Sequence, residues 1–212
     1  MLEARYLSYE RNAQLLFSNL TFEAKPGTFI FVSGKNGSGK SSLLKILAGL
    51  WSPTAGELLW QGQRLNITDP MFTSQLLYLG HKLGLQPTLT LFQNLQWLLG
   101  ISSLKSYTQA AITSVLAQLG IQEFGNIPCG CLSKGQQQRL ALARLWLDPR
   151  PYWVLDEPAT ALDEAGQNLL DQQIAKHVMN EGFLVMASHR SSILDSCKQI
   201  NKIEVQLGKK TC

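Results

Sequence analysis

A glycine-rich segment near residue 40 has the residue types and spacing of a phosphate-binding loop. Residues 34–41 read Gly-Lys-Asn-Gly-Ser-Gly-Lys-Ser, which fits the pattern G-x-x-x-x-G-K-[ST]. An apolar run at 29–32 precedes it and a helical pattern at 42–47 follows, as such a loop requires. Its backbone N–H groups would surround phosphate at a helix N-terminus. The residues expected to bind the nucleotide here are Gly34, Lys35, Asn36, Gly37, Ser38, Gly39, Lys40, Ser41 and Ser42.

Two residues of this loop have specific expected roles. Lys40 is expected to reach the β- and γ-phosphates of a nucleotide and to act in catalysis, and the Ser41 hydroxyl to bind Mg²⁺. The alternative is a glycine-rich turn with a chance lysine, which the flanking strand and helix patterns disfavour. The segment therefore predicts a site for a nucleoside triphosphate with its metal ion.

Two adjacent acids end an apolar run at 152–155. Because adjacent residues of a strand point to opposite sides, Asp156 and Glu157 are expected to have different tasks. Asp156 is expected to bind Mg²⁺ through water, and Glu157 to orient or deprotonate the attacking water as a general base. Such a pair alone is more often a solvated turn, but the phosphate-binding pattern favours the catalytic interpretation.

A third segment marks the start of a helix. Residues 133–136 read Ser-Lys-Gly-Gln, the Ser-x-x-Gln form of a capping box. A capped helix start is itself an anion site, because its free N–H groups and the helix dipole favour negative charge. An ordinary capping box is the commoner interpretation of this pattern in proteins generally.

These residues need a scaffold, and four short apolar runs supply one. Runs without polar alternation are typical of a parallel sheet covered on both faces; they lie at 29–32, 76–79, 153–155 and 183–186. Ligands of open α/β sheets bind beyond the carboxyl ends of the strands. The residues that follow these runs are Gly34, His81, Asp156 and His189, so the pattern predicts one shared site.

The remaining chain indicates an α/β fold with two smaller lobes. Helical spacing at 112–119 stops at Gly120, and the helix from Ser133 is expected to continue through 147. Residues 87–150 are therefore expected to form an inserted helical lobe, and 1–28 part of a small antiparallel sheet. The prediction is a single domain over 1–212, with a mostly parallel core sheet formed by 1–86 and 151–212.

Composition excludes several classes of protein. The 212 residues are 45% hydrophobic and 16% charged, which favours a packed core over disorder. The net charge of +4 does not demand a nucleic-acid partner. Four irregularly spaced cysteines do not form a disulfide framework and suit a reducing compartment. The N-terminus lacks a secretory pattern, and the uncharged run at 83–104 is interrupted by Gln, Asn and Pro, so no membrane span is expected.

Residues 132–136, Leu-Ser-Lys-Gly-Gln, resemble the LSGGQ signature of ATP-binding-cassette (ABC) ATPases, which belong to the P-loop NTPases, with Lys134 where glycine is commoner. The resemblance covers nearly all of 1–207. It implies that Ser133, Gly135 and Gln136 face the γ-phosphate of ATP bound to a second copy, and hence a homodimer of ATP-binding domains. The other implied positions are Tyr9 stacking on adenine, Thr160-Ala161-Leu162-Asp163 as the D-loop at the dimer seam, and His189 as the switch histidine on the γ-phosphate. An ordinary strand tyrosine remains the alternative for Tyr9, and His177 is expected to be a solvated surface residue.

Three further segments, 77–81, 89–95 and 136–147, are similar to a narrower group: the heme exporter ATP-binding subunits of cytochrome c maturation systems. His81 stands where most ABC ATPases have the Q-loop glutamine. The resemblance implies ATP and Mg²⁺ as cofactors, integral membrane subunits as partners, and a peripheral place on the cytoplasmic face of the bacterial inner membrane. It also implies that ATP hydrolysis drives heme export or heme handover, with heme handled by the partners and no nucleic acid bound. The alternatives are the ATPase of another small-substrate ABC transporter and a soluble, non-transport ABC ATPase.

Overall fold

The computed structural model describes residues 1–102, 108–148, 150–188 and 200–208, and these form two compact units. The core unit comprises 1–80, 150–157 and the chain from 176 onward. The helical unit comprises 81–149 and 158–175. The segment 158–175, which the sequence assigned to the core, therefore packs with the helical unit.

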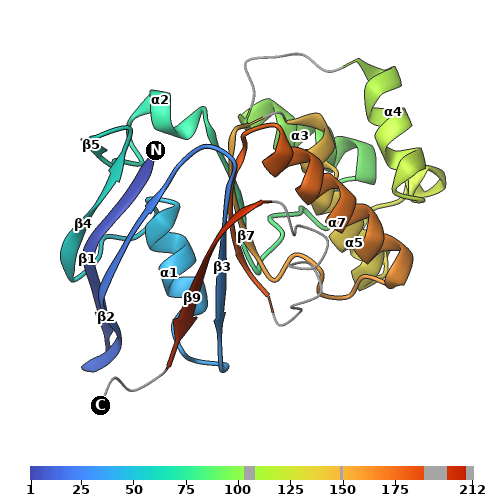
Figure 1. The fold of residues 1–212 in the computed structure, drawn as a ribbon. Helices are drawn as coiled ribbons and strands as arrows, with labels where there is room; N and C mark the ends of the chain where they lie inside the picture. Colours follow the sequence, from blue (N-terminus) through green and yellow to red (C-terminus); the bar gives the residue numbers. More distant parts are fainter. Residues whose placement is uncertain (103–107, 149, 189–199, 209–212) are drawn as a thin grey trace. The chain divides into compact units, whose positions relative to one another are not determined.

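The core unit is built around a parallel sheet with the strand order β6-β7-β8-β3-β9 (Figure 1). Its strands are β3 (Thr28–Gly34), β6 (Leu76–Leu79), β7 (Tyr152–Asp156), β8 (Phe183–Ala187) and β9 (Asn201–Leu207). The four predicted apolar strands are confirmed. The fifth, β9, was not foreseen, because it lies at the sheet edge and buries only two of its seven residues.

A second, antiparallel sheet of the core unit has the order β2-β1-β4-β5. Its strands are β1 (Leu2–Arg11), β2 (Gln14–Ala24), β4 (Ala55–Trp60) and β5 (Gln63–Arg64). The antiparallel sheet expected from residues 1–28 is confirmed by the pairing of β1 with β2. Strands β4 and β5 complete the sheet, and the short helix α2 (Pro70–Thr73) follows them.

One apolar cluster joins both sheets of the core unit to helix α1 (Lys40–Leu47). In β3, Ile30 and Val32 face this cluster, whereas the alternate residues Phe29 and Phe31 face the other side of the sheet and are also buried. The Tyr152 hydroxyl donates a hydrogen bond to Leu47 O at 2.8 Å, and complete burial raises the pKa of this tyrosine. Helix α1 is thus anchored at its end to the strand that carries the acidic pair.

The helical unit has its own apolar core. Its helices are α3 (Leu91–Ser102), α4 (Gln109–Gln118), α5 (Lys134–Leu142), α6 (Arg144–Leu147) and the first part of α7 (Glu164–Met179), with 3₁₀ turns at Gln122–Phe124 and Cys129–Cys131. The predicted helix start at Ser133 has its side-chain cap. The helix predicted from the spacing at 112–119 begins earlier than that pattern, after Thr108, whose side chain caps it. The continuous helix expected from Ser133 to Leu147 is wrong: it breaks at Ala143, whose N–H is shared between two carbonyls. Within the described residues, no helix has both the length and the apolar character needed to cross a bilayer.

Candidate nucleotide-binding site

The predicted phosphate loop connects β3 to α1 in the core unit. The Lys40 ammonium lies 2.9 Å from Gly34 O and 3.4 Å from Lys35 O, and the residue is only 8% exposed. Both of these carbonyls are neutral, and a buried ammonium is favoured by an opposite charge. The loop therefore holds a cation where an anionic phosphate would compensate it.

The glycine at the start of this loop has a steric reason. Gly34 has a φ of 150°, and a Cβ there would lie 2.6 Å from Ser38 Oγ and 2.8 Å from Leu207 O. No side chain fits between these atoms. The Ser38 hydroxyl is buried and has no hydrogen-bond partner among the described residues. A phosphate oxygen would supply one, so the loop fits the ligand that its pattern predicts.

The acidic pair lies at the carboxyl end of β7. Asp156 is 4% exposed, and by strand alternation it shares a face with Val154, which packs in the cluster that contains α1. Glu157 has a φ of 53°, and its N–H bonds Ala187 O at 2.9 Å. Asp156 is therefore the last residue with strand geometry, and the backbone at Glu157 already has a left-handed conformation.

A tyrosine that the sequence did not indicate lies on the same face as Asp156. Tyr78 of β6 pairs with Val154 of β7. Burial, together with the charge of Asp156, raises the pKa of Tyr78 to about 12, so its hydroxyl stays protonated at neutral pH. Nothing in the local pattern of residues 76–79 distinguishes this residue from an ordinary strand tyrosine.

The donor set suits Mg²⁺ bound together with nucleotide. No cluster of three His, Cys, Asp or Glu side chains occurs in the described part of the chain. Mg²⁺ in nucleotide sites is usually held by one or two protein oxygens, waters and phosphate oxygens. The exposed Ser41 hydroxyl and the Asp156 carboxylate fit that arrangement.

Tyr9 of β1, the residue implied for adenine, is part of an aromatic group with Phe17 of β2 and Trp51. Its ring centroid lies 6.1 Å from that of Phe17 and 5.9 Å from that of Trp51, and the ring planes are inclined to it by 28° and 27°. Lys45 Nζ lies 4.2 Å from the Trp51 ring centroid, and Arg11 lies 5.5 Å from it. Trp51 had no sequence signal, because it lies in the turn after α1. The group is aromatic and has two cations beside it, which is the chemistry that stacking on a purine base uses.

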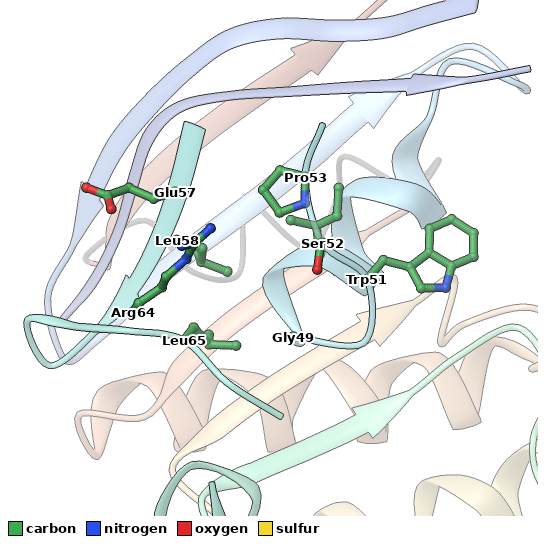
Figure 2. Close-up of a pocket in the computed structure, with 9 residues that line it drawn as sticks. Gly49, Trp51, Ser52, Pro53, Glu57, Leu58, Arg64 and Leu65 are labelled. Atoms are coloured by element: carbon green, nitrogen blue, oxygen red, sulfur yellow. The ribbon is translucent and has the colours of Figure 1, made fainter. Parts of the chain in front are cut away.

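A small cavity lies beside this aromatic group but is not the nucleotide site. Its volume is about 70 Å³, and it lies between the end of α1 and strands β4 and β5, with Trp51, Pro53 and Arg64 in its lining (Figure 2). That volume holds only a few water molecules. This cavity is too small to hold a nucleotide.

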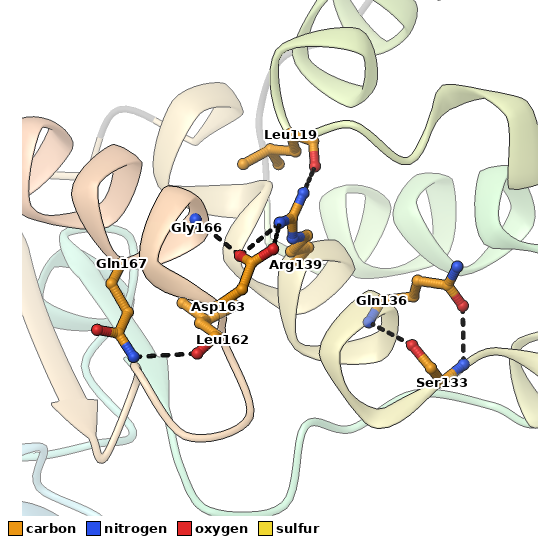
Figure 3. A network of polar contacts seen from close by, with 8 residues as sticks. All are labelled: Leu119, Ser133, Gln136, Arg139, Leu162, Asp163, Gly166 and Gln167. Atoms are coloured by element: carbon orange, nitrogen blue, oxygen red, sulfur yellow. Dashed lines mark hydrogen bonds and ion pairs between the residues drawn. The ribbon is translucent and has the colours of Figure 1, made fainter.

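The Ser133 element occupies the start of α5 in the helical unit. The Gln136 backbone N–H donates to Ser133 Oγ at 3.2 Å, and the Ser133 N–H donates to Gln136 Oε1 at 2.8 Å (Figure 3). The capping box is therefore confirmed. The exposed Lys134 follows at the first helical position, where a cation adds to the attraction for an anion.

Two predicted site residues have no described role in this geometry. His81 is exposed and is the first residue of the helical unit. His189 lies outside the described residues. The structure thus assembles the phosphate loop and Asp156 in the core unit, and Ser133, Gly135 and Gln136 with the D-loop segment in the helical unit.

The expectation that His177 is a solvated surface residue is wrong. Its imidazole stacks on Trp153 at 3.6 Å with an angle of 4° between the rings, and its Nε2 lies 3.1 Å from Phe183 O. Burial, partly offset by hydrogen bonds to backbone carbonyls, lowers its pKa to about 4. The partner ring lies 24 positions earlier in the chain, so helical spacing alone gave no sign of the contact.

We expect His177 to make stability depend on pH. Between pH 6.5 and pH 4, a histidine with a pKa of ~6.5 binds a proton in the unfolded chain that it does not bind in the folded chain. The contribution of His177 to the free energy of unfolding is therefore fully present above pH 6.5 and is lost as the pH falls toward 4. The expected loss between pH 7.5 and pH 5 is about 2 kcal/mol. Urea unfolding at both pH values should show a smaller loss for His177→Phe, which keeps a stacked ring without a titrating group. Equal losses in the two proteins would contradict this assignment.

Comparisons with known proteins agree with this geometry. The family model described as ABC transporter matches residues 17–160. The chain is 38% identical over 205 residues to the cytochrome c biogenesis ATP-binding export protein CcmA of Vibrio parahaemolyticus, covering 97% of this chain and 99% of the relative. It is 42% identical over 190 residues to CcmA of Escherichia coli K12, covering 90% and 89%. The fold is similar to that of the dimeric ATP-binding cassette MJ0796 bound to ADP and Pi, with a TM-score of 0.80, 23% identity and coverage of 99% and 97%.

Proposed function

This chain belongs to the ABC transporter family, and from that premise we propose that it is the ATP-hydrolysing subunit of a membrane complex in cytochrome c biogenesis. The identity of 38–42% to cytochrome c biogenesis export proteins, over nine-tenths of the chain or more, carries the proposal. In this proposal, ATP binding and hydrolysis drive either heme export or the handover of heme within the complex. The two units together form one ATP-binding domain.

The described residues support specific roles in this reaction. The loop from Gly34 to Ser42 binds the phosphates, with Lys40 on the β- and γ-phosphates and Tyr9 against adenine. Ser41 and, through water, Asp156 hold Mg²⁺, which neutralises phosphate charge when bound. Glu157 accepts the proton of the attacking water. His189 is proposed to contact the γ-phosphate, and His81 to occupy the place of the Q-loop glutamine.

The second half of each site comes from another copy of the chain. Ser133, Gly135 and Gln136 are proposed to bind the γ-phosphate of ATP held by the partner domain, because a capped helix start favours an anion. The dimer associates with integral membrane subunits on the cytoplasmic face of the bacterial inner membrane. Heme is handled by those subunits, and no nucleic acid is bound.

Co-purification tests the assignment to a membrane complex. We expect the tagged chain to sediment with membranes only when its membrane partners are co-expressed, and to copurify with cytochrome c biogenesis proteins as an active ATPase. The Lys40→Ala variant controls for ATPase contamination. Active chain that copurifies with the membrane subunits of a different transporter, or that stays soluble with those partners present, would contradict the proposal.

A further inference from the structure

The loop between β7 and α7, residues 158–163, lies along one face of α5 inside the helical unit. Three α5 residues contact it: Gly135, Gln138 and Arg139, whose spacing of i, i+3 and i+4 places them on the same side of a helix. They meet the beginning, the middle and the end of the loop. Helix α5 therefore contacts the segment 158–163, which follows Glu157, at its beginning, middle and end.

Gln138 holds the beginning of the loop. Its Nε2 donates a hydrogen bond to Pro158 O at 2.7 Å, and the residue is only 7% exposed. Pro158 is itself buried, and a buried carbonyl left without its donor is destabilising. Pro158 is joined by a peptide bond to Glu157, whose φ of 53° is uncommon for a residue with a side chain. The backbone after Glu157 thus depends on a tertiary contact for its course.

The middle of the loop approaches α5 closely. A Cβ at Gly135 would lie 2.9 Å from Ala161 O, so only glycine allows the helix and the loop to come this near. The close approach of Ala161 within the same chain therefore explains why this position of the signature is glycine, whether or not Gly135 also contacts nucleotide.

Arg139 holds the end of the loop. Its Nη2 lies 2.6 and 2.8 Å from the two oxygens of Asp163, and its Nη1 donates to Leu119 O at 2.6 Å (Figure 3). Asp163 also accepts from the N–H of Gly166 at 2.9 Å, and these bonds lower its pKa. An exposed ion pair adds little stability, but the planar guanidinium fixes direction as well as distance.

We propose that Gln138 is a positioning residue for hydrolysis: by holding Pro158 O it fixes the backbone that carries Glu157. The inference rests on the proposed role of Glu157 as the general base. It adds a structural link, because the helix that begins at Ser133 and is proposed to meet the partner's ATP also holds the loop behind the base. In this proposal, the position of Glu157 therefore depends on α5, the same helix whose start would contact the partner's ATP.

The test compares the same substitution at two neighbouring glutamines. Gln138→Glu replaces the buried donor with a carboxylate that repels Pro158 O, and we expect kcat to fall about 10–100-fold, because small misplacements of a catalytic group have effects of this size. The KM for ATP and the Kd of a fluorescent ATP analogue should stay within about twofold. Gln137→Glu is the matched control, because the Gln137 amide donates to Cys129 O and Leu132 O, at 2.8 and 3.2 Å, and not to the loop at 158–163. The kcat of this control variant should change less than about threefold. Equal falls in kcat for the two variants would overturn the proposal.

Two further measurements separate positioning from general damage. Gln138→Met keeps the side chain's volume without the donor or a new charge, and it should show the same fall in kcat with an unchanged Kd. In single turnovers, adding Gln138→Met to Glu157→Gln should cost less than about twofold, because the two residues act through one group. Additive losses would overturn the positioning role and leave Glu157 as the base. Full turnover in Glu157→Gln alone would instead remove the base assignment and this inference together.

Discussion

The Glu157→Gln variant is expected to bind ATP normally and to lose most of its turnover. Removing a general base costs about 10²–10⁴-fold in rate, whereas the phosphate loop and Lys40 are untouched. An ATP-bound dimer should accumulate, because the negative charge near the γ-phosphate falls while the binding contacts remain. ATPase assays of the purified membrane complex and size-exclusion chromatography with ATP would measure the two effects.

The neighbouring Glu164 provides the control for this experiment. It is an exposed acid in the first turn of α7, and Glu164→Gln makes the same change of charge away from β7. Its turnover is expected to stay within about twofold of wild type. Near wild-type turnover in the Glu157→Gln complex would show that another group activates the water.

Ser133→Arg and Lys40→Ala should each inactivate the homodimer but complement one another in a mixed dimer. If Ser133 acts on the partner's nucleotide, the heterodimer has one site with both lesions and one with neither. Each homodimer is expected at about 1% of wild-type activity or less, since losing a group that stabilises the transition state costs about 10²–10³-fold. The heterodimer, purified through two different tags, should be at least about tenfold more active than either homodimer.

The matched control places both lesions in one chain. A heterodimer of the Ser133→Arg/Lys40→Ala double variant with a wild-type chain has one lesion in each shared site, so it should stay inactive. Loss of the Ser133 cap alone costs about 1 kcal/mol, and unfolding measurements would show that the variants remain folded. Inactive trans heterodimers, shown to be dimeric, would contradict a site shared between two copies.

Tertiary structure, not local pattern, decided several of the contacts above. Strand β9 is an edge strand whose polar residues match no buried-strand pattern, and β4 becomes a strand by pairing with β1. The stack of His177 on Trp153 and the group of Trp51 with Tyr9 join residues that are remote in sequence. Such contacts depend on how elements pack, and residue type at one position does not encode its distant neighbour.

The sequence by itself determined the phosphate loop, the acidic pair at the end of β7, the capping box at Ser133 and the four buried strands. Each of these depends on residues a few positions apart, because a loop, a helix cap or an apolar run is set by local hydrogen bonds and spacing. Only the tertiary structure decided that α5 holds the loop at 158–163, since Gln138 and Pro158 are twenty positions apart. Their meeting follows from how α5 packs within the helical unit, where both residues are buried and an amide–carbonyl bond is strengthened by the low local dielectric.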